Sequence, residues 1–147
     1  MNYDITVSNL QDKGWRMTKI RKAIIKVFAD NPTPLSAGQV EEILNKAKVK
    51  ADKTTVYREI QFLLENNCII EVFLFPNEVS YESAELKHHH HLVCEKCGKI
   101  EKMTRCIADE LSREIYLKKG FKVKRHVLEF YGICRECAQK MAVAGRD

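Results

Sequence analysis

Two pairs of cysteines constrain this chain more than any other feature of its sequence. Each pair has the spacing Cys-x-x-Cys, and the four residues are Cys94, Cys97, Cys134 and Cys137. A tight turn holds the two thiols of a pair close together, so two such turns can complete a tetrahedral zinc site with four cysteine ligands. Because 36 residues separate the pairs, the segment between them must fold so that the turns meet. Two disulfides or a redox pair are the alternatives to structural zinc.

The segment between the pairs has the patterns that such a fold needs. They predict a strand after the first pair, a helix over about 104–118 and a strand over 121–131. In that helix, Ile107, Leu111 and Ile115 are expected to face inward. Structural zinc contributes ~10–16 kcal/mol in small peptides, so it would matter to a small domain with a thin core.

Charge and hydropathy restrict the class of protein. The 147 residues allow one domain or two small ones, and 25 Lys and Arg against 20 Asp and Glu give a net charge of +5. Basic residues gather over 13–26 and 46–58, where they can contact a phosphate backbone or form solvated helix faces. No apolar run approaches the ~18 residues of a membrane span, and the start lacks the apolar core of a secretory signal. A cytoplasmic location is expected, where disulfides are rare.

The first half of the chain predicts helices followed by a β-hairpin. Residues that cap helices precede three amphipathic stretches, namely Thr18, Ser36 with Gln39, and Asp52. A weaker helix is expected over 4–11. Residues 68–75 and 79–82 are rich in β-formers and flank a Pro-Asn turn. Three helices and a hairpin in about 80 residues match the winged helix-turn-helix plan.

The helix that follows Asp52 would be the one that enters the major groove of DNA. At ~100° per residue, the side chains opposite its buried stripe are Thr54, Arg58, Gln61 and Glu65, with Tyr57 on the flank. Arg58 can donate two hydrogen bonds to guanine, and Tyr57 can contact a thymine methyl group. The alternative is that Arg58 pairs with a neighbouring acid and Tyr57 fills the margin of the core.

Four consecutive histidines, His88–His91, precede the first cysteine pair. Successive side chains of a strand point to opposite faces, so His88 and His90 form one pair and His89 and His91 another. One run can therefore supply two separate metal sites. Imidazole binds zinc, iron, nickel and copper, so the ligand type alone does not select the metal. An exposed polar strand that binds no metal is the alternative.

Together these residues resemble the ferric uptake regulator (Fur) family of bacterial metal-dependent repressors. The resemblance covers essentially the whole chain through the order and spacing of Arg16-Met17-Thr18 with Arg21, Leu35-Ser36-Ala37, Thr54-Thr55-Val56-Tyr57-Arg58, Tyr81-Glu82, the histidine run with Cys94-Glu-Lys-Cys97-Gly-Lys99, and Tyr131-Gly132-Ile133-Cys134 with Cys137. It implies an α+β fold, with a winged helix-turn-helix DNA-binding domain over 1–83. A small α/β dimerisation domain with the four-cysteine zinc site would follow over 84–147.

The same resemblance implies a role for each matching residue. It assigns structural zinc to Cys94, Cys97, Cys134 and Cys137, a regulatory metal to His88, His90, Asp109 and His126, a second metal at the hinge to Glu82, His89 and His91, and DNA contacts to Arg16, Lys19, Arg21, Thr54, Tyr57 and Arg58. The expected cofactors are structural Zn²⁺ and a regulatory Zn²⁺ or Fe²⁺. The expected partners are a second copy of the chain and double-stranded DNA with an inverted-repeat operator, and neither a membrane nor a small organic substrate is expected.

Two departures from the family pattern affect the hinge site. Many members have a histidine just before the helix that begins near Ser36, where this chain has Pro34, and an acid where it has Lys102. Glu101 lies one place earlier, and a one-residue offset in a strand moves a side chain to the other face. Glu101 and Cys106 are the candidate substitutes at the hinge site. The missing acid weakens the interpretation as a peroxide sensor.

The sequence thus predicts a metal-dependent transcriptional repressor that controls metal-ion homeostasis. Zinc is slightly favoured over iron as effector, since zinc accepts four-coordinate sites and the histidine run resembles the zinc-sensing branch. An enzyme is not expected, because a site with four cysteine ligands has no open position and the zinc-deaminase signature is missing. A metal-independent winged-helix regulator with only structural zinc is the alternative.

Overall fold

The computed structural model describes residues 1–144 and divides the chain into two compact units. The first unit is Met1–Leu86, and the second begins at Lys87. Within the described residues, no helix is both long enough and apolar enough to cross a bilayer. The mixed α+β fold expected from the sequence is confirmed, with helices and a three-stranded sheet in each unit.

Four helices of the first unit begin where their capping residues stand. They are α1 (Tyr3–Asp12), α2 (Lys19–Asp30), α3 (Ala37–Lys46) and α4 (Lys53–Glu65). Thr18 Oγ1 accepts the Arg21 N–H at 3.1 Å, and Asp52 Oδ1 accepts the Thr55 N–H at 2.7 Å. Ser36 and Gln39 form the complete capping box. These caps satisfy backbone donors that a helix start leaves without an intrahelical partner.

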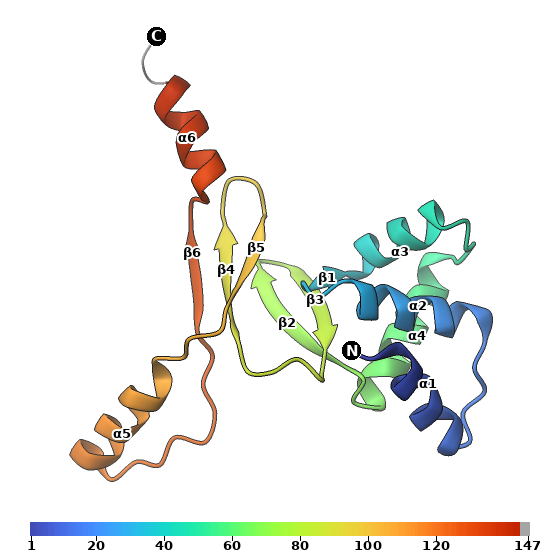
Figure 1. Ribbon diagram of the computed structural model, residues 1–147, viewed down its shortest axis with the longest axis horizontal. Helices are drawn as coiled ribbons and strands as arrows, with labels where there is room; N and C mark the ends of the chain where they lie inside the picture. The colour runs from blue at the N-terminus through green and yellow to red at the C-terminus, as the bar shows by residue number, and fades with distance from the viewer. Residues whose placement is uncertain (145–147) are drawn as a thin grey trace. The chain divides into compact units, whose positions relative to one another are not determined.

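The helices of the first unit enclose one apolar core, which the hairpin closes. Its fully buried side chains include Leu10, Ile24, Phe28, Val40, Ile60 and Leu63. The hairpin consists of β2 (Ile69–Phe75) and β3 (Glu78–Ser83), and the short β1 (Leu35–Ser36) pairs with the other side of β3. Figure 1 shows this three-stranded sheet beside the helices. The architecture is the winged helix-turn-helix expected from the sequence.

The second unit is built on a mixed sheet with β4 at its centre. Strand β4 (His90–Cys94) pairs antiparallel with β5 (Ile100–Met103) and parallel with β6 (Glu129–Gly132). Helix α5 (Ala108–Lys119) belongs to the connection from β5 to β6, and α6 (Arg135–Ala144) follows β6. Figure 1 shows β4 between its two partners. This parallel pairing brings residues that are far apart in sequence to the same end of the sheet.

Two expectations for the second unit are wrong in detail. Ile107 and Leu111 are about half exposed, at 46% and 54%, instead of facing inward. The reason is that α5 extends away from the sheet of its own unit (Figure 1), so Ala108 is its only buried residue. The strand expected over 121–131 is confined to Glu129–Gly132, because only these residues pair with β4.

Candidate metal centres

The four cysteines of the two pairs meet at one end of the β4–β6 ladder. Cys94 ends β4, and its partner in the parallel register is Gly132, two residues before Cys134. Cys137 lies in the first turn of α6. The four Sγ atoms lie within 4.8 Å of one another, and none forms a disulfide. The fold of the intervening segment thus brings the two turns together, as the spacing requires.

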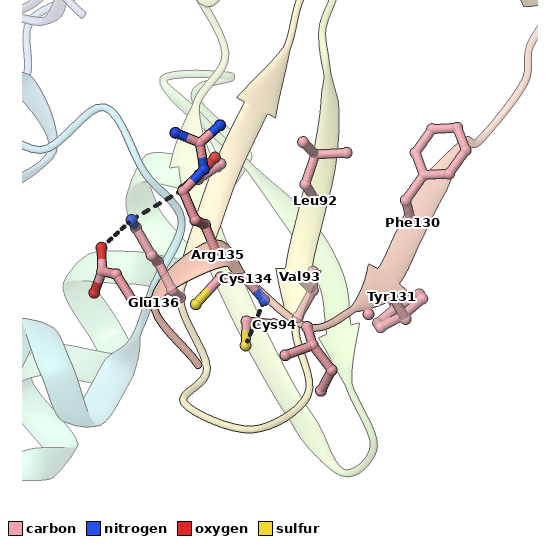
Figure 2. A pocket seen from close by; sticks show the side chains of 12 residues that line it. Leu92, Val93, Cys94, Phe130, Tyr131, Cys134, Arg135 and Glu136 are labelled. Carbon is pink, nitrogen blue, oxygen red and sulfur yellow. Dashed lines mark hydrogen bonds and ion pairs between the residues drawn. The ribbon is translucent and has the colours of Figure 1, made fainter. Parts of the chain in front are cut away.

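The geometry of this four-cysteine group fits a tetrahedral zinc ion. The Sγ atoms of Cys97 and Cys134 are 3.8 Å apart, and zinc–sulfur bonds of ~2.3 Å give a tetrahedral edge of about 3.8 Å. The Cys134 N–H donates to Cys94 Sγ at 3.3 Å, as Figure 2 shows. This bond and one from the Cys97 N–H lower the pKa of the Cys94 thiol to about 6. Hydrogen bonds with the thiols of Cys134 and Cys97 raise the pKa of Cys137 to about 12.

Charged side chains line a pocket together with Cys94 and Cys134 of the four-cysteine group. Lys99 Nζ lies 3.0 Å from a carboxylate oxygen of Glu101 and 3.0 Å from one of Glu136. Figure 2 shows the Glu136 contact at the edge of a pocket that β4 and β6 also line. Glu101 therefore forms an ion pair with Lys99.

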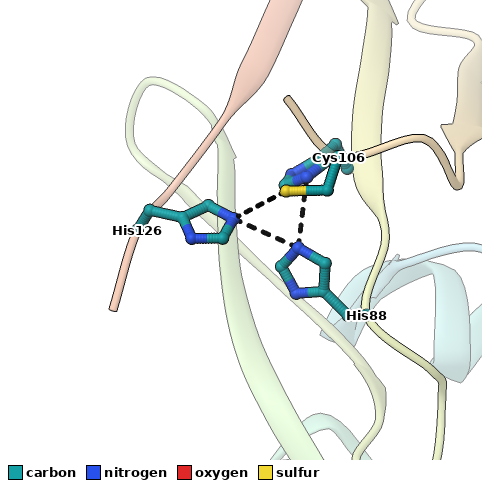
Figure 3. A group of neighbouring side chains, drawn as sticks. His88, Cys106 and His126 are labelled. Carbon is teal, nitrogen blue, oxygen red and sulfur yellow. Dashed lines mark hydrogen bonds between the residues drawn. The ribbon is translucent and has the colours of Figure 1, made fainter. Parts of the chain in front are cut away.

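His88 and His90 lie on one face of the segment that leads into β4, as the alternation predicts. Their Nε2 atoms are 3.2 Å apart, and Nε2 of His126 lies 3.1 Å from that of His88. His126 comes from the segment before β6, and Figure 3 shows its ring turned toward His88. Burial and the neighbouring rings of His88 and His126 lower the pKa of His90. A lowered pKa favours the neutral imidazole, which is the form that binds metals.

The fourth side chain of this group is a cysteine that the sequence did not assign to it. Ligand atoms of His88, His90, His126 and Cys106 all lie within 4.8 Å of one another. Asp109, which the resemblance implies as a ligand, is exposed in the first turn of α5 and is not part of this group. From the sequence, Cys106 was considered only as a substitute ligand at the hinge site, whereas the structure groups it with His88, His90 and His126.

His89 and His91 form the second histidine pair, with Nε2 atoms 3.2 Å apart. The oxygen of Lys87 lies 2.8 Å from Nδ1 of His89. In the β4–β5 register the partner of His91 is Lys102, whereas Glu101 is opposite Leu92. Glu101 therefore lies on the other face of the sheet from His91. Glu82, the third residue implied for the hinge site, is a buried residue of β3 in the first unit.

Helix α4 presents the side chains expected to contact DNA. Val56, Ile60 and Leu63 are buried, whereas the opposite face exposes Thr54, Tyr57, Arg58 and Gln61. Tyr57 is 47% exposed, so it does not fill the margin of the core. Arg16 and Lys19, before and at the start of α2, are also exposed.

Arg21 differs from these residues because its guanidinium group is engaged inside the first unit. Its Nε donates to Glu59 at 2.7 Å and its Nη2 donates to the same carboxylate at 3.3 Å. The Nη1 group donates to the Arg16 carbonyl at 2.9 Å. The guanidinium carbon also lies 3.5 Å from the ring centroid of Phe62. Arg21 thus connects α2 to α4 and holds the backbone at Arg16.

Comparisons with known proteins agree on one family. Residues 12–131 match the Ferric uptake regulator family. The ferric uptake regulation protein of Campylobacter jejuni is 26% identical over 97% of this chain and 94% of the relative. The peroxide-responsive repressor PerR of Staphylococcus aureus is 25% identical over 92% of this chain and 90% of the relative. The solved structure of the ferric uptake regulator from Francisella tularensis with iron has a TM-score of 0.75 at 27% identity, covering 85% of this chain and 96% of that one.

Proposed function

This chain belongs to the ferric uptake regulator family, and from that premise we propose that it is a metal-dependent repressor that controls metal-ion homeostasis. Members of this family regulate transcription in response to metal and are not enzymes. The observation that carries the proposal is the convergence of three imidazole Nε2 atoms, from His88, His90 and His126, in a chain that also has a separate four-cysteine group. A site for a structural ion and a site for an exchangeable ion are what a metal-dependent regulator needs.

We assign structural zinc to the four-cysteine group and regulatory metal to the histidines. Cys94, Cys97, Cys134 and Cys137 fill all four positions of a tetrahedral site, so no position remains for a substrate. Of the ligands implied for the regulatory ion, His88, His90 and His126 are supported by their geometry, whereas Asp109 is supported by the resemblance alone. Zinc is favoured over iron as effector, because zinc accepts a four-coordinate site rich in imidazole.

A second regulatory ion at the hinge would use Glu82, His89 and His91. The chain has Pro34 where many members supply a histidine and Lys102 where many supply an acid. The positive charge of Lys102 on the strand residue opposite His91 disfavours a cation there. We therefore expect this hinge site to bind metal more weakly than the site around His88.

For DNA binding we propose that residues 1–83 supply the contacts and that residues 84–147 bind metal and dimerise. Arg58 and Tyr57 would contact base edges, and Thr54, Arg16 and Lys19 would contact the backbone or minor groove. Arg58 is exposed and has no ion-pair partner within the described part of the chain, which leaves its guanidinium available. Arg21 has a positioning role instead, through its contact with the Arg16 carbonyl.

Regulation would follow from a difference in metal affinity between two arrangements of the homodimer. The protein binds its effector ion more tightly in the DNA-competent arrangement, so the ion shifts the population toward it. By reciprocity, an inverted-repeat operator raises the affinity of the protein for that ion by the same factor. We place this activity in the cytoplasm, where both the operator and the exchangeable metal pool are present.

The test selects DNA from a random duplex library with the zinc-loaded protein and then measures affinity across buffered Zn²⁺, Fe²⁺ and Mn²⁺ at fixed salt. Salt is fixed because affinity for DNA depends steeply on it. We expect inverted repeats to be enriched, with tight binding when zinc fills both kinds of site and weak binding when only the four-cysteine group holds zinc. His126→Ala should lose the metal response, whereas Cys68→Ser, outside every metal group, should keep it. Equal binding with and without metal would support the metal-independent regulator instead.

A further inference from the structure

Cys106 lies in the link between β5 and α5, where it is half-buried. Its Sγ lies 3.4 Å from Nε2 of His126 and 3.4 Å from the Ala108 amide nitrogen, which donates to it. Figure 3 shows the sulfur directed at the same point as the rings of His88 and His126. The thiol is therefore held at the histidine group by the start of α5.

Hydrogen bonding among these rings does not account for their arrangement. Nε2 of His88 lies 3.2 Å from Nε2 of His90 and 3.1 Å from Nε2 of His126. A ring nitrogen of a neutral imidazole offers either one N–H or one lone pair. It can therefore make a good hydrogen bond to only one of two neighbouring ring nitrogens. A cation at the centre would instead accept a lone pair from every ring.

The spacing of the four donor atoms matches the edges of a tetrahedron around zinc. Zinc–nitrogen bonds of ~2.0–2.1 Å and zinc–sulfur bonds of ~2.3 Å give nitrogen–nitrogen edges of about 3.4 Å and nitrogen–sulfur edges of about 3.5 Å. The observed values are 3.1 and 3.2 Å between nitrogens and 3.4 Å between nitrogen and sulfur. The four side chains thus fit a small tetrahedral ion with little movement.

Asp109 has a different role available to it. Helix α5 begins after Ile107, which supplies no side-chain cap, and its first turn carries Asp109 and Glu110. Negative side chains in a first turn interact favourably with the positive end of the helix dipole. An exposed Asp109 can therefore stabilise the start of α5, the same helix start whose Ala108 N–H holds Cys106.

We propose that the thiolate of Cys106, and not the carboxylate of Asp109, is the fourth ligand of the regulatory site. This inference rests on the proposed function, because it concerns the site around His88. The thiol loses its proton when it binds the ion, since the thiolate is the metal ligand. Three imidazoles and one thiolate form a donor set that favours zinc over manganese, which prefers carboxylate, carbonyl and water oxygens.

The test uses cobalt(II) as a spectroscopic probe on full-length protein whose four-cysteine group already holds one zinc per chain, verified by metal analysis. A thiolate bound to cobalt gives a near-ultraviolet charge-transfer band, and tetrahedral cobalt gives strong visible bands. The wild type should show both. Cys106→Ser should lose the near-ultraviolet band and bind cobalt at least ~10-fold more weakly, whereas Asp109→Asn should keep both the band and the affinity.

Alkylation mapped by mass spectrometry provides a second measurement. A further equivalent of zinc should protect Cys106 from iodoacetamide and leave the labelling of Cys68 unchanged. If Cys106→Ser keeps the band while Asp109→Asn loses cobalt affinity, the thiolate assignment is overturned and the histidine site stands. If His126→Ala also keeps full cobalt affinity, the regulatory site itself is wrong.

Discussion

Arg21 shows at the scale of a single residue why a basic cluster is not always a DNA-binding face. Its charge belongs to the basic run over 13–26, yet Glu59 on α4 accepts two of its hydrogen bonds. Both side chains are largely buried, at 14% and 15% exposure. Charge counting along the chain does not detect a partner 38 residues away, so the basic run alone gave no sign that Arg21 forms an internal pair.

Replacing Arg21 should therefore affect stability. We expect Arg21→Ala to lower the free energy of unfolding by roughly 1–3 kcal/mol, because it leaves the Glu59 carboxylate without its charged partner. Arg21→Lys should recover only part of this, because an ammonium group cannot form the two-pronged pair or stack on Phe62 in the same way. Urea denaturation of both variants measures the effect.

A double-mutant cycle with Glu59→Gln isolates the pair. The cost of the double variant should be clearly less than the sum of the two single costs. Additive costs would show that Arg21 and Glu59 do not interact in solution. Lys22→Ala, one residue along α2 and exposed, is the matched control and should change stability by less than ~0.5 kcal/mol.

At the scale of elements, local capping signals determine where the helices of the first unit begin. Asp52 caps α4, and the Thr55 N–H that it accepts lowers the pKa of its carboxyl below 3.8. A lowered folded-state pKa stabilises the fold at pH values above the unfolded-state pKa. That contribution is lost as the pH falls from about 3.8 through the folded-state value.

Asp52→Asn should therefore change the pH dependence of stability. Asparagine also caps helices but does not titrate. The difference in urea midpoint between wild type and variant should not change with pH around pH 6. It should decrease as the pH falls below about 4. Asp30→Asn is the control, because Asp30 stands at the C-terminal end of α2 and does not cap the start of a helix. A difference that stays constant down to about pH 3 would contradict the role of the Asp52 charge.

The elements of the second unit were harder to predict because they depend on distant partners. Strand β6 exists only where Glu129–Gly132 pair with β4, so composition over 121–131 overestimated its length. Helix α5 has an apolar stripe, but Ile107 and Leu111 remain exposed because α5 packs on no layer of its own unit. Periodicity shows that a helix has an apolar face and does not show what covers that face.

At the scale of the whole molecule, the two units differ in what stabilises them. The first has a continuous apolar core, whereas the buried apolar side chains of the second are only Val93, Cys94, Ala108 and Cys137 within the described residues. Two of these four are members of the four-cysteine group. We therefore expect the second unit to depend on metal bound at the four-cysteine group for much of its stability.

Removing zinc should consequently unfold the two units unequally. After chelation at neutral pH, we expect hydrogen exchange to lose most of its protection in β4 and β6 while α2 and α4 keep theirs. The reason is that structural zinc contributes ~10–16 kcal/mol of binding free energy in small peptides. Mass spectrometry of exchange, with metal content measured in parallel, tests this expectation.

Two further measurements complete the test. Readdition of one zinc per chain should restore protection in β4 and β6, and Cys134→Ser should mimic the chelated state. Equal protection of β4 with and without zinc, in protein shown to be metal-free, would mean that the sheet is stable without an ion in the four-cysteine group.

The candidate sites could be predicted from the sequence to the extent that their ligands lie close together in it. The alternation of His88–His91 separated the two histidine pairs correctly, because strand geometry is local. The four cysteines were grouped by their spacing, although the parallel pairing of β4 with β6 that joins them was not foreseen. Cys106 was considered only for the hinge site, and its place in the group around His88 was not predicted because it depends on how the chain turns between β5 and α5.

The short segment from His88 to Cys94 has a consequence for how proteins of this kind can change over evolution. It carries members of three candidate metal groups, and two of these groups take alternate residues of the histidine run. One residue inserted between His91 and Cys94 would exchange the faces of the two histidine pairs while leaving the cysteine turn intact, whereas two would restore the faces. Metal preference can therefore diverge gradually through substitutions, but changes in length here are restricted to even steps.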